Sequence, residues 1–117
     1  MNIIKNNFVF HNGETATADG NVLTVNVANQ VAVYITGSTT SHTIKFEGSD
    51  GVDVNANWYP AYARRSDDIT YDSQTTDVAE CWVVDLTPWV AFRVRIDAIS
   101  GTNATLTAIG RVVDTNG

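Results

Sequence analysis

The amino-acid sequence predicts an all-β protein, an antiparallel β-sandwich of about eight strands with a jelly-roll-like or immunoglobulin-like arrangement. Three observations predict this class. Short runs that alternate apolar and polar residues recur along the chain, and turn-forming residues separate them. No apolar i, i+3, i+4 pattern persists for three helical turns, so helices are not expected.

The N-terminal part of the chain is expected to begin with a strand over Ile3–Phe10 that ends at His11–Gly13. Because asparagines weaken its pattern, residues 1–12 are predicted to form an edge strand or an arm. Two β-branched runs, Asn21–Val27 and Gln30–Thr36, follow it. Only two residues separate these runs, and asparagine tolerates a left-handed conformation, so a tight hairpin is predicted there.

The next strand begins after the turn Gly37–Ser41 and has a clear period of two. His42, Ile44 and Phe46 share one row, which places His42 at the rim of the core. Gly48–Gly51 is predicted to end the strand, because glycine reaches positive φ and Asp or Ser can bond its own backbone.

An aromatic strand is predicted over Asn57–Ala63, at a sheet edge or a bulge, because Pro60 cannot donate to a ladder. Arg64–Asp77 is a long polar connection of the kind that is functional or mobile, with a short strand near Ile69–Tyr71.

The C-terminal part contains three predicted strands, over Ala79–Leu86, Trp89–Ala98 and Ala104–Val113. Cys81, the only cysteine, is predicted to be a small buried apolar side chain, and a lone cysteine allows no intrachain disulfide. The middle strand alternates most clearly: Val90, Phe92, Val94 and Ile96 are expected to face inward, and Ala91, Arg93, Arg95 and Asp97 outward.

Length and charge limit the function. The 117 residues fit a single domain, 1–117, with enough surface buried for a core. The net charge of −6 disfavours nucleic-acid binding, which needs cations to neutralise phosphates. The segment Glu47–Glu80 carries eight carboxylates and two arginines, so one acidic region is expected. The sequence contains no long apolar segment, so neither a membrane span nor a secretion signal is predicted.

Several residues could carry chemistry, but each of them also has a structural role. Asp50, Asp53 and Asn55, or Asp67, Asp68 and Asp72, could offer oxygens to calcium, but β-turns collect aspartate for backbone reasons, so no metal site is predicted. The two histidines stand beside no cysteine or serine motif, and there is no glycine-rich phosphate loop. We therefore predict a protein that is not an enzyme and that has no cofactor.

Two kinds of contact surface remain open. Exposed aromatic rings beside carboxylates could bind a glycan, although core packing is an alternative role for the same rings. Sheet edges and arginines favour a protein interface. The predicted contact residues are Asp53, Asn55, Trp58, Tyr59, Tyr62, Arg64, Arg65, Tyr71, Arg93 and Arg95.

The order Phe46-Glu47-Gly48-Ser49, Asp50-Gly51 and Asn57-Trp58 resembles small β-sandwich structural proteins of tailed bacteriophages, over about residues 40 to 112. This resemblance implies a virion component without catalytic residues. The small size of the chain favours a capsid decoration subunit. A tail or baseplate accessory protein and a module that binds host-surface glycans are the alternatives. Val52–Ala56 lengthens a link that is short in the family and marks a candidate contact loop.

The resemblance also implies partners and a location. Other virion proteins of the capsid or tail are the expected partners, and a homo-oligomer, with a trimer as the working hypothesis, is the expected assembly. The location expected is the virion, assembled in the cytoplasm of a bacterial host.

Overall fold

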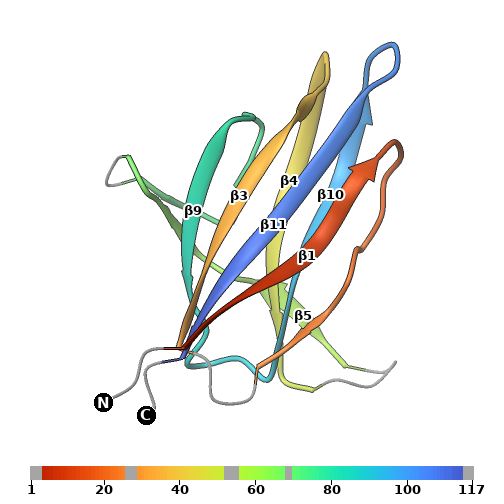
Figure 1. The fold of residues 1–117 in the computed structure, drawn as a ribbon. Helices are drawn as coiled ribbons and strands as arrows, with labels where there is room; N and C mark the ends of the chain where they lie inside the picture. Colours follow the sequence, from red (N-terminus) through yellow and green to blue (C-terminus); the bar gives the residue numbers. More distant parts are fainter. Residues whose placement is uncertain (1–3, 26–28, 52–55, 68–69, 115–117) are drawn as a thin grey trace.

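The computed structural model of the protein describes residues 4–25, 29–51, 56–67 and 70–114. These residues form two antiparallel sheets in two layers (Figure 1). The six-stranded sheet has the order β1 (Ile4–Glu14), β11 (Thr105–Asp114), β3 (Gln30–Ser38), β9 (Glu80–Asp85), β6 (Ala63–Arg65) and β7 (Tyr71–Asp72). The five-stranded sheet has the order β2 (Leu23–Thr24), β10 (Ala91–Ser100), β4 (Ser41–Ser49) and β5 (Trp58–Pro60), and β8 (Gln74–Thr75) also pairs with β4.

The predicted all-β sandwich is confirmed, with eleven strands in the described part of the chain where about eight were expected. The additional strands are short ones, and a run of two or three residues leaves no periodic pattern in a sequence. No helix in the described ranges is long and apolar enough to cross a membrane.

The core lies between the sheets and is built from alternate residues of the strands. Val33 and Ile35 of β3 and Ile44 and Phe46 of β4 are fully buried. Phe10 and Phe92, from opposite sheets, meet edge to face with ring centroids 5.7 Å apart. Burial of such side chains is the main stabilising contribution, at roughly 25 cal/mol per Å² of apolar surface.

His42 lies on the buried row of β4, as predicted, and is 5% exposed. Its Nδ1 is 2.6 Å from the hydroxyl oxygen of Thr39 at the preceding turn. This hydrogen bond gives one ring nitrogen a partner in an apolar setting, whereas the other, Nε2, is buried without a hydrogen-bond partner among the described residues.

The first strand is longer than predicted and does not end at His11–Gly13. β1 lies at the edge of the six-stranded sheet and pairs with β11 from Ile4 to Glu14, with register shifts after Val9 and after His11. The polar residues that suggested a turn are accommodated by these irregularities, and Gly13 adopts a φ of 64°.

The predicted hairpin at Ala28-Asn29 is wrong. β2 pairs with β10 in the five-stranded sheet, whereas β3 pairs with β11 and β9 in the six-stranded sheet. The two runs therefore lie in different layers. Strands that are adjacent in sequence pair with each other only when they belong to the same sheet. Here β2 and β3 belong to different sheets, so they do not pair.

Gly48 does not end β4, contrary to the prediction. The strand continues through Ser49, and the glycine is needed for space: a Cβ atom at Gly48 would lie 2.1 Å from the ring of Trp89. Trp89 covers the inner face at this end of the sheet. The turn begins at Asp50 instead.

Cys81 and Val90 face the opposite way from the prediction. In β9 the inward row is Glu80, Trp82 and Val84, so the thiol of Cys81 lies on the outer face and is partly buried. Val90 precedes β10 and is 43% exposed. The regular inward row begins only at Phe92, where pairing with β2 and β4 holds the strand.

The region from Asn57 to Asp77 contains several short strands. The predicted aromatic strand divides into β5 and β6, which belong to different sheets. β5 lies at the edge of its sheet, as Pro60 predicted. The expected short strand near Ile69–Tyr71 is β7, which starts at Tyr71.

His11 links the two sheets. Its ring is buried, and Nε2 is 2.5 Å from the carbonyl oxygen of Val94 in β10. Because a carbonyl only accepts, Nε2 carries the proton. β2 pairs with the edge of β10 only at Ala91 and Phe92, and further along β10 Ala18 forms backbone hydrogen bonds with Ile96. The Val94 carbonyl lies between these two contacts, and the His11 imidazole supplies its hydrogen bond. Gly20 lies against this ring, where a Cβ atom would come within 2.5 Å.

Replacing His11 with leucine should lower the free energy of unfolding by about 1–3 kcal/mol, because the buried Val94 carbonyl loses its partner. Urea denaturation measures the change. Asn12→Ala, at the exposed neighbouring position, is the control and should change stability by less than about 0.5 kcal/mol. Equal losses in the two variants would contradict the assigned role of His11.

Candidate protein interface

The residues predicted as contacts do not converge on one site. Asp53 and Asn55 lie outside the described residues, so their positions test nothing. The others occupy separate places: Trp58, Arg93 and Arg95 on the outer face of the five-stranded sheet, Tyr59 at the end of that sheet, Arg64 and Tyr71 on the outer face of the six-stranded sheet, Arg65 beside the buried Glu80, and Tyr62 exposed between β5 and β6.

On the five-stranded sheet, Arg93 and Arg95 converge on one carboxylate. The Nε atoms of Arg93 and Arg95 donate to Oε1 of Glu47 at 2.9 and 3.0 Å. Arg93 lies directly across from Glu47 in the ladder between β10 and β4, and Arg95 is two residues further along the same face. The pairing of the two strands therefore positions all three side chains.

Further charges extend this group along the sheet. Asp97 accepts from Arg95 Nη1 at 2.7 Å and lies 3.4 Å from the ammonium of Lys45. Arg93 Nη1 is 3.6 Å from a carboxylate oxygen of Asp19. We call Arg93, Arg95, Glu47, Asp97 and Lys45 the charge ladder.

The ladder shifts the pKa values of its acids. Burial by itself raises the pKa of Glu47, but hydrogen bonds and charge from Arg95 and Arg93 outweigh burial and hold it below its ordinary value. Burial likewise raises the pKa of Asp97, and Lys45 and Arg95 outweigh it and lower that pKa. Both carboxylates are therefore ionised at neutral pH.

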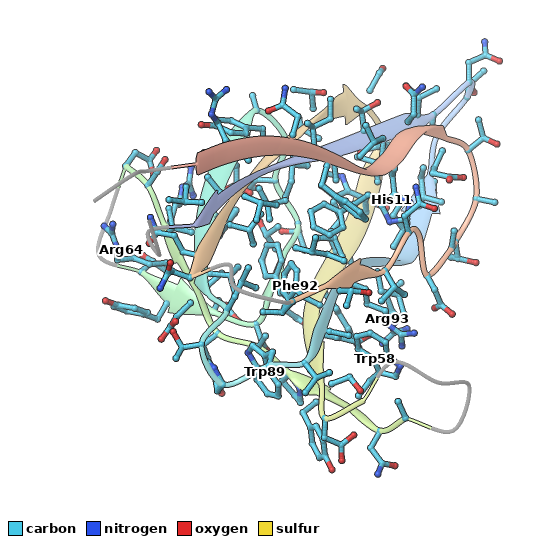
Figure 2. All side chains as sticks on the ribbon, turned by 60° about the horizontal axis from the view of Figure 1, so that its bottom comes forward. His11, Trp58, Arg64, Trp89, Phe92 and Arg93 are labelled. Atoms are coloured by element: carbon cyan, nitrogen blue, oxygen red, sulfur yellow. The ribbon has the colours of Figure 1, made fainter. Side chains whose placement is uncertain are left out.

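Trp58 and Tyr59, which the sequence offered as an aromatic platform for a glycan, each lie against another side chain of the protein. The guanidinium of Arg93 lies 4.1 Å from the ring centroid of Trp58, and Figure 2 shows the two side chains next to each other. The ring of Tyr59 stacks on Trp89 with a centroid distance of 6.4 Å. One face of each ring is already occupied by the protein.

Arg65 forms ion pairs with several carboxylates. One of them is the carboxylate of Glu80, which is buried on the inward row of β9. Arg65 Nη1 lies 3.0 Å from Oε2 of Glu80, and Nε lies 2.7 Å from Asp67. Oε1 of Glu80 accepts from the Thr75 hydroxyl and from Trp82 Nε1 at 3.1 Å. Sequence reasoning did not find this buried acid, because a carboxylate at the start of a strand is ordinarily expected to face solvent.

Among the described residues, no group of three or more histidine, cysteine or carboxylate side chains could hold a metal ion. Both histidines are buried and bonded to the fold. Asp53, Asn55 and Asp68, three of the six calcium candidates, are outside the described ranges.

The outer face of the six-stranded sheet carries a row of exposed apolar side chains. The register pairs Val9 with Ile109, Ile109 with Tyr34 and Tyr34 with Cys81. Val9, Ile109 and Tyr34 are 43%, 37% and 47% exposed. A contiguous apolar row at the centre of a face is unusual for a free surface.

The adjacent row on the same face is cationic. It runs Asn7, Arg111, Ala32, Val83, Arg64 and Tyr71 across the six strands. These two rows contain two arginines and no carboxylate, although the chain has a net charge of −6. We call them together the apolar–arginine face.

Sequence reasoning found Arg64 and Tyr71 of this face and missed Val9, Tyr34 and Ile109. Each missed residue belongs to a strand whose other row is the core, so an apolar residue there gave no separate signal. Only the lateral order of β1, β11 and β3 brings the three together.

Replacing Glu47 with glutamine should make the melting temperature depend less on pH in the acidic range. Since the pKa of Glu47 is depressed in the fold, its contribution is present above about pH 4.3, the ordinary glutamate value, and is lost as pH falls below it. Melting temperatures between pH 3 and 7 should therefore fall less steeply in the variant. Asp50→Ser, in an exposed turn, is the control and should keep the wild-type slope; equal slopes for wild type and Glu47→Gln would contradict the prediction.

Comparison with known sequences points to proteins of phage elements. The chain is 29% identical over 106 residues to the phage-like element PBSX protein XepA of Bacillus subtilis (strain 168), an alignment that covers 91% of this chain and 36% of XepA. It is 30% identical over 98 residues to the SPbeta prophage-derived uncharacterized protein YomS of the same organism, covering 84% of this chain and 79% of YomS.

Two crystal structures share the fold. The SPBc2 prophage-derived protein YomS superposes with a TM-score of 0.86 at 26% identity, over 97% of this chain and 96% of that chain. The PBSX exported protein XepA gives the same TM-score at 28% identity, over 96% of this chain and 38% of that chain. The chain therefore spans little more than a third of XepA. The model of the XepA family matches residues 4–111, and the chain belongs to this family of phage-element proteins.

Proposed function

We propose that the protein is a non-catalytic structural subunit of a phage particle, a decoration or accessory protein that attaches to another virion protein. The apolar–arginine face is the observation that carries this proposal. Exposed aromatic and aliphatic side chains beside arginine, without acids, are the composition typical of the centre of protein interfaces.

The fold does not need these outward side chains for its own core. Tyr34 and Ile109 point away from the buried rows of β3 and β11, so their exposed surface is available for a partner. Burying that surface would stabilise a complex at roughly 25 cal/mol per Å². Tyrosine is also among the residue types that contribute most when an interface is formed.

Charge indicates the kind of partner surface. Arg64 and Arg111 flank the apolar row, whereas the chain as a whole is acidic. A partner with an apolar patch bordered by carboxylates would complement this face. Capsid and tail proteins are both candidates for that partner, and a virion location follows from either.

Assembly with further copies is part of the proposal. Symmetric oligomers are the usual state of repeated subunits, and a trimer stays our working prediction. XepA is an exported protein of PBSX and is much longer than this chain. Most of the XepA chain has no counterpart in this protein, so the proposal does not extend the activity of whole XepA to this chain.

Replacing Tyr34 and Ile109 together with serine should weaken attachment to undecorated particles or tails of the source virus at least tenfold. Both substitutions remove exposed apolar surface from the centre of the face, and a tenfold loss corresponds to about 1.4 kcal/mol. Co-sedimentation of the purified protein with the particles measures the change. Arg111→Glu should add a further loss if the partner surface is acidic.

Tyr62→Ser is the matched control, because Tyr62 is 69% exposed but lies outside the apolar–arginine face. It should attach as the wild-type protein does. Thermal melting of each variant separates loss of attachment from loss of folding. A wild-type protein that binds neither particles nor tails, or a double variant that binds normally, would contradict the proposal.

A further inference from the structure

The outer face of the five-stranded sheet, opposite the proposed interface, is hollowed on both sides of Arg95. One hollow of about 360 Å³ is bordered by Thr17, Ala18, Asp19, Arg95, Ile96 and Asp97. A second hollow of about 200 Å³ is bordered by Lys45, Phe46, Glu47, Pro60, Ser73, Gln74 and Arg95. Among the described residues, Arg95 is the one that borders both hollows.

A third hollow continues the same face toward the other end of the sheet. It has a volume of about 350 Å³ and is lined by Thr40, Ser41, His42, Thr43, Thr76 and Ala98. The register of β10 and β4 places Ala98 across from Thr43, and Arg95 across from Lys45. We call the three hollows together the polar trough: its floor is β4 and β10, and its borders are Thr17–Asp19 on one side and Ser73–Thr76 on the other.

The trough carries charges of both signs. The residues that line it include the cations Lys45 and Arg95 and the anions Asp19, Glu47 and Asp97. A polyanion would meet three carboxylates and a polycation would meet two cations. A neutral ligand with many hydroxyl groups avoids both penalties, because each hydroxyl can donate to an acid and accept from an arginine.

The polar groups of the trough are already held in place. Arg95 is fixed by hydrogen bonds to Glu47 and Asp97, and Glu47 also accepts a hydrogen bond from Arg93, which lies outside the lining of the hollows. Donors and acceptors that are ordered before binding lose little side-chain entropy when a ligand arrives. The uncharged hydroxyl groups of serine and threonine along the borders are further hydrogen-bond partners for a ligand.

We propose that the polar trough binds a neutral, hydroxyl-rich oligosaccharide. Recognition rests on hydrogen bonds along the charge ladder, because the Trp58 face next to Arg93 is not free for stacking on a sugar. This places a glycan site away from the Trp58 and Tyr59 platform that the sequence suggested. The site is independent of the proposed attachment, since it lies on the other sheet and stays exposed when the apolar–arginine face is covered.

The test is an array of bacterial-surface oligosaccharides that contains neutral and anionic members, followed by calorimetric titration of the strongest neutral binder. Gln74→Trp should weaken binding at least tenfold by filling the second hollow, and it alters an exposed side chain outside the charge ladder. Arg95→Gln should also weaken binding at least tenfold, because it removes the guanidinium shared by two hollows.

Arg111→Ala is the control, since it removes an arginine from the opposite sheet, and it should bind the oligosaccharide as wild type does. Three results would overturn the proposal: no oligosaccharide bound by the wild-type protein, a preference for anionic over neutral members, or unchanged affinity in Gln74→Trp. Particle attachment is measured with other variants, so failure of one proposal leaves the other open.

Discussion

Burial of one side of every long strand is the constraint on which the rest of this structure depends. The two sheets face each other, so each inward position must be apolar or must carry a polar group with a partner. Three inward positions of the described chain carry titratable side chains, and each has a partner. His11 bonds the Val94 carbonyl, and His42 bonds Thr39. Glu80 pairs with Arg65 and accepts hydrogen bonds from Thr75 and Trp82. The bond of His11 also joins two strands that are distant in sequence.

Once the inward rows are fixed, the outward rows are free to differ, and the two sheets differ in chemistry. Two neighbouring rows on the six-stranded sheet present apolar residues and arginines without acids. The five-stranded sheet presents alternating cations and anions that bond one another. A small sandwich with two such unlike faces is suited to holding one partner while a second surface remains exposed.

Membership of the XepA family fits this division of the molecule. The fold accounts for nearly all of YomS and little more than a third of XepA, so the same sandwich occurs both in a short chain and within a longer one. A sandwich that closes its core internally can be reused in this way, because its stability does not depend on neighbouring domains. Partner choice then depends on residues that face outward.

Much of the fold could be predicted from the sequence, because a period of two reports directly which strand residues are buried. Ile44, Phe46, Phe92 and Val94 are buried as that period predicts. Local turn chemistry was less reliable. Gly48 was expected to bend the chain, but it makes room for Trp89, a residue forty-one positions away in the sequence.

The candidate sites depended on the tertiary structure to a much greater degree. The sequence determined that the chain is an acidic, all-β domain with arginines on one row of its clearest strand. Only the tertiary structure decided which strands are neighbours, and so decided that Val9, Ile109 and Tyr34 form one row and that Arg93 and Arg95 share Glu47. The physical reason is that periodicity acts along a strand, whereas a surface is made across strands, where residues far apart in sequence meet.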